Sequence, residues 1–212
     1  MFDVKKIKYD LDPILDHFVL SRDIDCVVLQ NWLNVSVPKG YMLPELLEEK
    51  RKLLEYEGSA WNEEELKMHF ISFVFSFSNL QVPHKMKLFY ERQLSAVVQD
   101  TPLSVVCHAL LASPLGLNTP KKPYFFLQEF KKGKKATDDA EGQMLIAMLI
   151  AQAQNANNEP IYGCYLIGKD WYFTNLIGKR YCVSKSYDAT DPKELTEILF
   201  ILERLKHIVK LD

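Results

Sequence analysis

Short apolar runs bounded by turn-forming residues dominate the middle and later parts of the chain, and they predict β-strands. Six such runs lie at residues 86–93, 103–112, 124–131, 161–167, 171–177 and 180–187, and the last three predict two or three strands. The segments Gly168-Lys-Asp170 and Gly178-Lys179 are expected as hairpin turns between the last three strands.

Apolar residues at helical spacing predict one helix before these strands and another between them. Asn62 can cap the first helix, which continues to Phe77 and begins with three glutamates, where the helix dipole favours negative charge. The second helix is expected to begin near Asp138, with Glu141 completing a capping box. Its body, residues 144–151, is apolar on every side, which implies burial against a sheet.

Both ends of the chain also carry helical patterns. Asp191 is the expected N-cap of the last helix, because Pro and then Glu follow it at the positions typical of a helix start. The first 60 residues form an appended segment, with an amphipathic helix at 11–20, a short strand-like or mixed stretch at 26–37 and a helix that starts near Pro44.

The order of these elements predicts an α/β fold, in which helices flank a mixed β-sheet. A chain of 212 residues fits one large domain with an extension. We therefore divide it into an N-terminal extension, residues 1–60, packed on a core at 61–212 that ends in the C-terminal helix.

Composition narrows the classes of protein that fit. The formal net charge of −2 does not indicate a general nucleic-acid binder, so such a role would need a local basic patch. The four cysteines are scattered without CxxC spacing, which argues against zinc and favours small buried side chains in a reducing compartment. There is no secretory signal pattern and no apolar run of about 20 residues. We therefore expect a cytoplasmic protein with no membrane contact.

The segment Tyr124-Phe-Phe-Leu-Gln-Glu-Phe-Lys131 carries the chemistry of greatest interest. If it is a strand, Glu129 and Lys131 share a face, because side chains alternate along a strand. A carboxylate and an ammonium group at a strand end suit metal-assisted phosphodiester hydrolysis, in which one binds the metal and the other positions the attacking water. Acid-x-Lys occurs five times in the chain, and only this instance follows a strand-like apolar run.

With these motifs in this order, the chain resembles the PD-(D/E)XK nuclease superfamily, whose restriction-endonuclease-like fold has a helix, a three-strand meander, a second helix and a further strand. The resemblance covers residues 60–185. It implies that Glu129 binds a metal, that Lys131 assists the attacking water, and that Gln143 orients a catalytic group or a phosphate. Glu64, or its neighbours Glu63 and Glu65, would be the acid of the first helix.

One position departs from the family pattern. The chain has no Pro-Asp dipeptide, and His108 stands where the family has its metal-binding Asp in the second strand. An imidazole suits Mg²⁺ poorly and would favour Mn²⁺, so His108 is either a relocated metal ligand or a histidine of the core. If the protein is active, Mg²⁺ or Mn²⁺ would be its cofactor.

Lysines bracket the third strand and form a candidate contact with phosphates. The candidate nucleic-acid-binding residues are Lys122, Lys132, Lys134 and Lys135. The resulting hypothesis is a degenerate nuclease-fold protein that binds nucleic acid with weak or no cleavage. The alternatives are an active Mg²⁺- or Mn²⁺-dependent nuclease and a protein-interaction module, which could form a homodimer through the N-terminal extension and the last helix.

Overall fold

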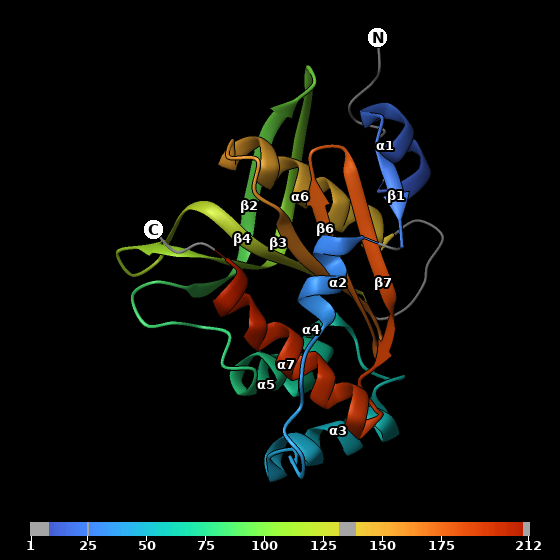
Figure 1. Ribbon diagram of the computed structural model, residues 1–212. Helices are drawn as coiled ribbons and strands as arrows, with labels where there is room; N and C mark the ends of the chain where they lie inside the picture. The colour runs from blue at the N-terminus through green and yellow to red at the C-terminus, as the bar shows by residue number, and fades with distance from the viewer. Residues whose placement is uncertain (1–8, 25, 132–138, 210–212) are drawn as a thin grey trace.

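A seven-stranded mixed sheet lies at the centre of the protein in the computed structural model, which describes residues 9–24, 26–131 and 139–209 (Figure 1). The strand order is β1-β7-β6-β5-β4-β3-β2. The strands are β1 (Ser21–Asp23), β2 (Lys87–Val98), β3 (Thr101–Leu115), β4 (Thr119–Lys131), β5 (Ile161–Ile167), β6 (Asp170–Ile177) and β7 (Arg180–Asp188). The mixed α/β architecture predicted from the sequence is confirmed.

Two pairs of strands are parallel, namely β4 with β5 and β1 with β7, and the other pairs are antiparallel. A parallel pair needs a long crossover connection, and the helix α6 (Ala140–Asn155) lies within the connection from β4 to β5. Residues 140–151 of α6 are all buried, which explains why this segment is apolar on every side.

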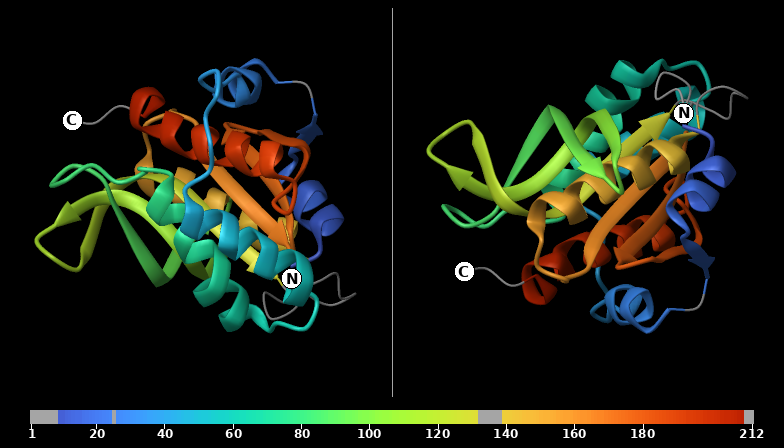
Figure 2. Two further views of the ribbon diagram at one scale, coloured as in Figure 1. Left: turned by 90° about the horizontal axis from the view of Figure 1, so that it is seen from below. Right: turned by 90° about the horizontal axis from the view of Figure 1, so that it is seen from above.

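Helices cover both faces of the sheet (Figure 2). On one face α6 packs with α1 (Leu11–Phe18), and Ile14, Phe18 and Met144 belong to the same buried cluster. The opposite face carries the remaining helical segments, whose buried side chains include Trp32 and Leu199. These segments are α2 (Val27–Leu33), α3 (Glu45–Glu57), α4 (Glu63–Leu66), the π-helical segment η2 (Lys67–Ile71), α5 (Ser72–Phe77) and α7 (Pro192–Ile208).

Local capping signals were mostly accurate. Asn62 and Glu65 form a reciprocal capping box at the start of α4, and Asp191 accepts hydrogen bonds from two backbone N–H groups at the start of α7. α6 begins near Asp138 as predicted, with Asp139 as its N-cap, whose side chain accepts the Glu141 N–H. Glu141 itself is engaged elsewhere, as described below.

The first two strands extend further than their apolar runs. The ladder between β2 and β3 continues to the pair Val98–Thr101 and closes through Gln99 and Asp100, both with positive φ (47° and 62°). Two consecutive residues of this kind make a two-residue hairpin turn that matches the twist of the strands.

The stretch 26–37 is helical at its start, contrary to the strand-like or mixed prediction. α2 buries Leu29 and Trp32, and the Trp32 indole donates a hydrogen bond to the Ile201 carbonyl of α7 (2.8 Å). Tertiary packing therefore overrides the weak helix propensity of its paired valines.

The prediction that the cysteines are all reduced side chains was wrong for two of them. Cys26 and Cys182 form a disulfide across 156 residues of sequence, whereas Cys107 and Cys164 are buried and not disulfide-bonded. The scattered spacing gave no sign of the bridge, because only the pairing of β1 with β7 brings Cys26 next to Cys182. Persistent disulfides are typical of oxidising compartments. The cytoplasmic location stays a prediction.

Across the described ranges, no helix is both long and apolar enough to span a membrane. Elements from the first 60 residues contact the remainder through β1 on β7, α1 on α6 and α2 on α7. The boundary at residue 60 stays a prediction.

Candidate functional site

The backbone of β4 places the predicted catalytic pair at the end of a central strand. Glu129 lies opposite Tyr165 of β5, and Lys131, the last residue of β4, lies opposite Ile167. Gln143 is buried in the first turn of α6. The side chain of Glu129 lies outside the described part of the structure, as do Lys132, Lys134 and Lys135, so their predicted roles stay predictions.

Lys131 is directed toward the first helix of the core. Its side chain is only 12% exposed, and its Nζ lies 3.7 Å from Oε1 of Glu63 in α4. The acid of α4 that approaches the strand end is therefore Glu63, one residue before the position favoured from the sequence. This contact holds an ammonium group close to the carboxyl-terminal end of β4.

Glu64 instead belongs to a charged bridge between α4 and β2. The Nζ of Lys67 lies 2.8 Å from Oε1 of Glu64 and 2.8 Å from Oε1 of Glu91, and its side chain is only 15% exposed. Burial lowers the pKa of Lys67, but the hydrogen bonds to the two carboxylates outweigh burial and raise it above its ordinary value. Lys67 is therefore a fixed cation between two carboxylates.

His108 lies on β3 at the level of Glu91, between the cross-strand pairs Tyr90–Ala109 and Arg92–Cys107. Glu91 has a positive φ of 51° and interrupts the ladder at this level. The Nδ1 of His108 accepts the backbone N–H of Phe130 (3.3 Å), and the two rings lie 4.3 Å apart. The imidazole is thus tied to β4 next to Lys131.

The environment of His108 favours the neutral imidazole. Burial is the main cause that lowers its pKa below the ordinary value of 6.5; Lys131 and Lys67 add to this effect, while Glu91 and Glu63 oppose it. The folded chain therefore releases the proton at a lower pH than the unfolded chain.

This difference predicts a loss of stability in acid. As the pH falls below about 6.5, the unfolded chain takes up a proton that folded His108 still excludes, so the free energy of unfolding decreases until the folded pKa is passed. Urea unfolding between pH 8 and pH 5 should show this decrease. His108→Gln should remove part of the slope, and an identical slope in wild type and variant would contradict the prediction.

The described residues do not fit a divalent metal. No group of three or more His, Cys, Asp or Glu side chains is placed to hold a metal ion within the ranges that the structure describes. Glu64 and Glu91 are already bridged by Lys67, and one ring nitrogen of His108 is taken by Phe130. The metal set Glu64, His108 and Glu129 was a prediction from family resemblance, and it stays untested because the side chain of Glu129 is not described.

A second polar cluster lies at the start of α6 and was not recognised from the sequence. Arg22 of β1 donates two hydrogen bonds to Glu141 (2.7 and 3.2 Å), and the Tyr165 hydroxyl donates a third (2.9 Å). These bonds satisfy the carboxylate of a largely buried glutamate. Because Tyr165 lies opposite Glu129, this cluster flanks the candidate site, and the N-terminal segment contributes Arg22 to it.

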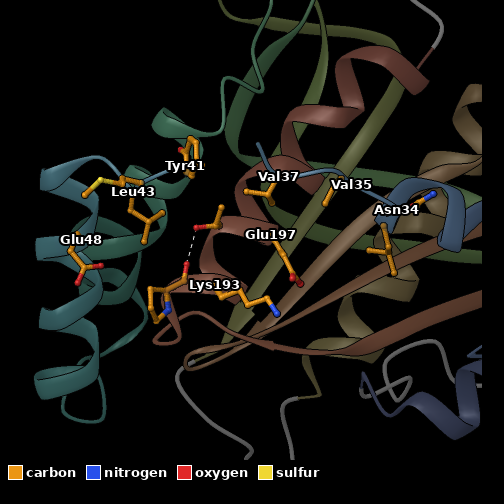
Figure 3. Close-up of a pocket in the computed structure, with 12 residues that line it drawn as sticks. Asn34, Val35, Val37, Tyr41, Leu43, Glu48, Lys193 and Glu197 are labelled. Carbon is orange, nitrogen blue, oxygen red and sulfur yellow. Dashed lines mark hydrogen bonds between the residues drawn. The ribbon is translucent and has the colours of Figure 1, made fainter. Parts of the chain in front are cut away.

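A separate hollow of about 860 Å³ lies between the N-terminal segment and α7 (Figure 3). Val35, Val37 and Tyr41 line it from the segment after α2, and Lys193 and Glu197 line it from α7. It is formed by the two regions that the sequence suggested for docking or dimer formation. That role stays a prediction.

The sequence matches no known protein-family model and shows no significant similarity to a curated protein.

Proposed function

We propose that this chain is a degenerate member of the PD-(D/E)XK nuclease superfamily, with a restriction-endonuclease-like core, which binds nucleic acid and cleaves it weakly or not at all. The order of elements supports the resemblance. A helical segment at 63–77 precedes the antiparallel meander β2–β3–β4, and α6 then leads to β5, which is parallel to β4.

The observation that carries the loss of catalysis is the position of Lys67. A metal-dependent phosphodiesterase needs carboxylates that are available to a divalent cation. Here the ammonium group of Lys67 lies between the carboxylates of Glu64 and Glu91, so a metal would have to displace a bound cation. His108 at the position of the family's strand Asp also removes one formal negative charge from the ligand set.

Binding is expected through lysines at the end of β4 and in the segment that follows it. Lys131 places one positive charge at the strand end, and Lys132, Lys134 and Lys135 follow in the sequence. Binding to phosphates releases counterions, so the affinity should fall steeply with salt.

The test is binding and hydrolysis measured on the same preparation. We expect fluorescence anisotropy to show salt-dependent binding of duplex DNA or RNA, with no cleavage above background in Mg²⁺ or Mn²⁺. Neutralising Lys132, Lys134 and Lys135 together should reduce the slope of log K against log salt by about 2 to 3, because each lost phosphate contact removes about 0.9. The matched control neutralises Lys39, Lys52 and Lys193, which lie in other parts of the chain, and should leave the slope unchanged.

Two results would contradict the proposal. An unchanged affinity in the strand-end triple variant would remove the assigned binding surface. Metal-dependent cleavage that is lost in both Glu129→Ala and Lys131→Ala would instead establish the alternative, an active nuclease.

A further inference from the structure

The β3–β4 hairpin extends away from the body of the protein, where it is the yellow-green ribbon at the far left of Figure 1 and again at the left of both views in Figure 2. We call residues 112–124 the arm. Its tip turns at Gly116, which has a φ of +67°, and it exposes Leu115 (63%) and Leu117 (82%) to solvent. Two leucines at the end of a projecting hairpin contribute nothing to the core.

The arm is stiffened close to its tip. Pro114 and Pro120 lie opposite each other in the ladder, and each has a fixed φ and no N–H to donate. The Lys87 ammonium of β2 donates to the Leu117 carbonyl (2.6 Å), and the Arg92 guanidinium donates to the Asn118 carbonyl (3.2 Å). Two cations of β2 therefore hold the backbone of the tip in place.

Positive charge gathers on the arm, whose own residues include no acid. Lys121 and Lys122 are exposed on β4, and together with Lys87 and Arg92 they place four positive charges around the tip. Residues 112–124 contain no Asp or Glu, although the whole chain has a net charge of −2. The partners of Lys87 and Arg92 at the tip are neutral carbonyls, which do not cancel these charges.

We propose that the arm binds duplex nucleic acid, with the cations on the phosphates and the tip leucines wedged between base steps from the minor groove. The inference rests on the proposed function and adds the form of the substrate and a second contact surface. Apolar side chains inserted from the minor groove unstack a base step and kink the duplex. The charge pattern fits this partner, because cations from both β2 and β4 accompany a small apolar tip.

The arm also sets the length of the bound duplex. β4 runs from the arm to the candidate site, and its 13 residues span at most about 40 Å at 3.3 Å per residue. About 12 base pairs cover the same distance at 3.4 Å per step. Duplexes shorter than about 12 base pairs should therefore contact either the arm or the strand end of β4 and bind more weakly.

The test uses the full chain and a duplex of about 20 base pairs that carries 2-aminopurine, whose fluorescence rises on unstacking. Wild type should bind and raise the fluorescence. Leu115→Ser/Leu117→Ser should abolish the rise and weaken binding about tenfold. Lys121→Ala/Lys122→Ala should reduce the slope of log K against log salt by about 2. The control Val97→Ser, at another exposed apolar strand position, should behave as wild type.

The outcomes separate this inference from the proposed function. If wild type binds no nucleic acid, the proposed function fails. If wild type binds but neither arm variant differs from it, only the arm inference is overturned. If wild type binds vesicles containing phosphatidylserine through Leu115 and Leu117, while its duplex binding is insensitive to both arm variants, the arm is a membrane contact and the inference is overturned.

Discussion

Reduction of the Cys26–Cys182 disulfide is expected to lower the free energy of unfolding by about 3 to 5 kcal/mol. The bridge joins residues 156 positions apart, and a cross-link that closes so long a loop removes much of the freedom of the unfolded chain. For a chain of this size the thermal midpoint should fall by about 6 to 20 °C. Thermal unfolding followed by circular dichroism, with and without reductant, measures the change.

Two variants make this result specific. Cys26→Ala/Cys182→Ala should unfold near the reduced wild type and should not respond to reductant. Cys107→Ala, which removes a buried cysteine outside the disulfide, should keep the full response to reductant. Equal midpoints for oxidised and reduced wild type would contradict the expectation. If the protein functions in the cytoplasm as predicted, the reduced midpoint is the relevant one.

The second large effect is expected at Gly142, in the first turn of α6. A Cβ atom at this position would lie 1.9 Å from the Tyr9 carbonyl oxygen and 3.3 Å from the Leu11 backbone nitrogen. Backbone atoms cannot rotate away as a side chain can, so Gly142→Ala should push the start of α1 away from α6. Ile14 and Phe18 of α1 are fully buried, and their loss should cost about 2 to 5 kcal/mol.

A decrease in the free energy of unfolding would identify the steric clash, because replacing Gly by Ala in a helix otherwise stabilises it by about 1 kcal/mol. Urea unfolding of Gly142→Ala should be compared with Gly178→Ala, where no atom lies within 4 Å but φ is +56°. In this control the free energy of unfolding should decrease only by the backbone strain of a positive φ, about 1 to 2 kcal/mol. A Gly142→Ala variant as stable as wild type would show that α1 does not need this close approach.

The sequence predicted the central elements well because their signals are local. The apolar runs that became β5, β6 and β7 and the capping residues Asn62 and Asp191 depend on residues only a few positions apart. β1 has three residues and exists through its pairing with Arg180–Cys182, so no local pattern could reveal it.

In the candidate site, too, some features follow from local sequence and others only from contacts between distant residues. Glu129 and Lys131 could be placed at a strand end from the apolar run that precedes them. The contact of Lys67 with Glu91 could not be predicted, because the two residues are 24 positions apart and meet only when η2 lies beside β2. Arg22 and Glu141 are 119 residues apart, and their contact follows from the position of β1 beside β7. Sequence patterns thus identify candidate groups, whereas the fold determines which charges neutralise one another.

The parallel pairing of β1 with β7 also has a consequence for synthesis of the chain. Ser21 leaves the ribosome about 160 residues before its partner Arg180, which corresponds to a delay of about 8 to 30 s at 5 to 20 residues per second. For most of this interval Glu141 has not been made and cannot bind Arg22. Cys26 also cannot form its native disulfide, because Cys182 has not been made. β1 therefore cannot join the sheet until β7 has been made, so the N-terminal segment lacks its sheet partner throughout this interval.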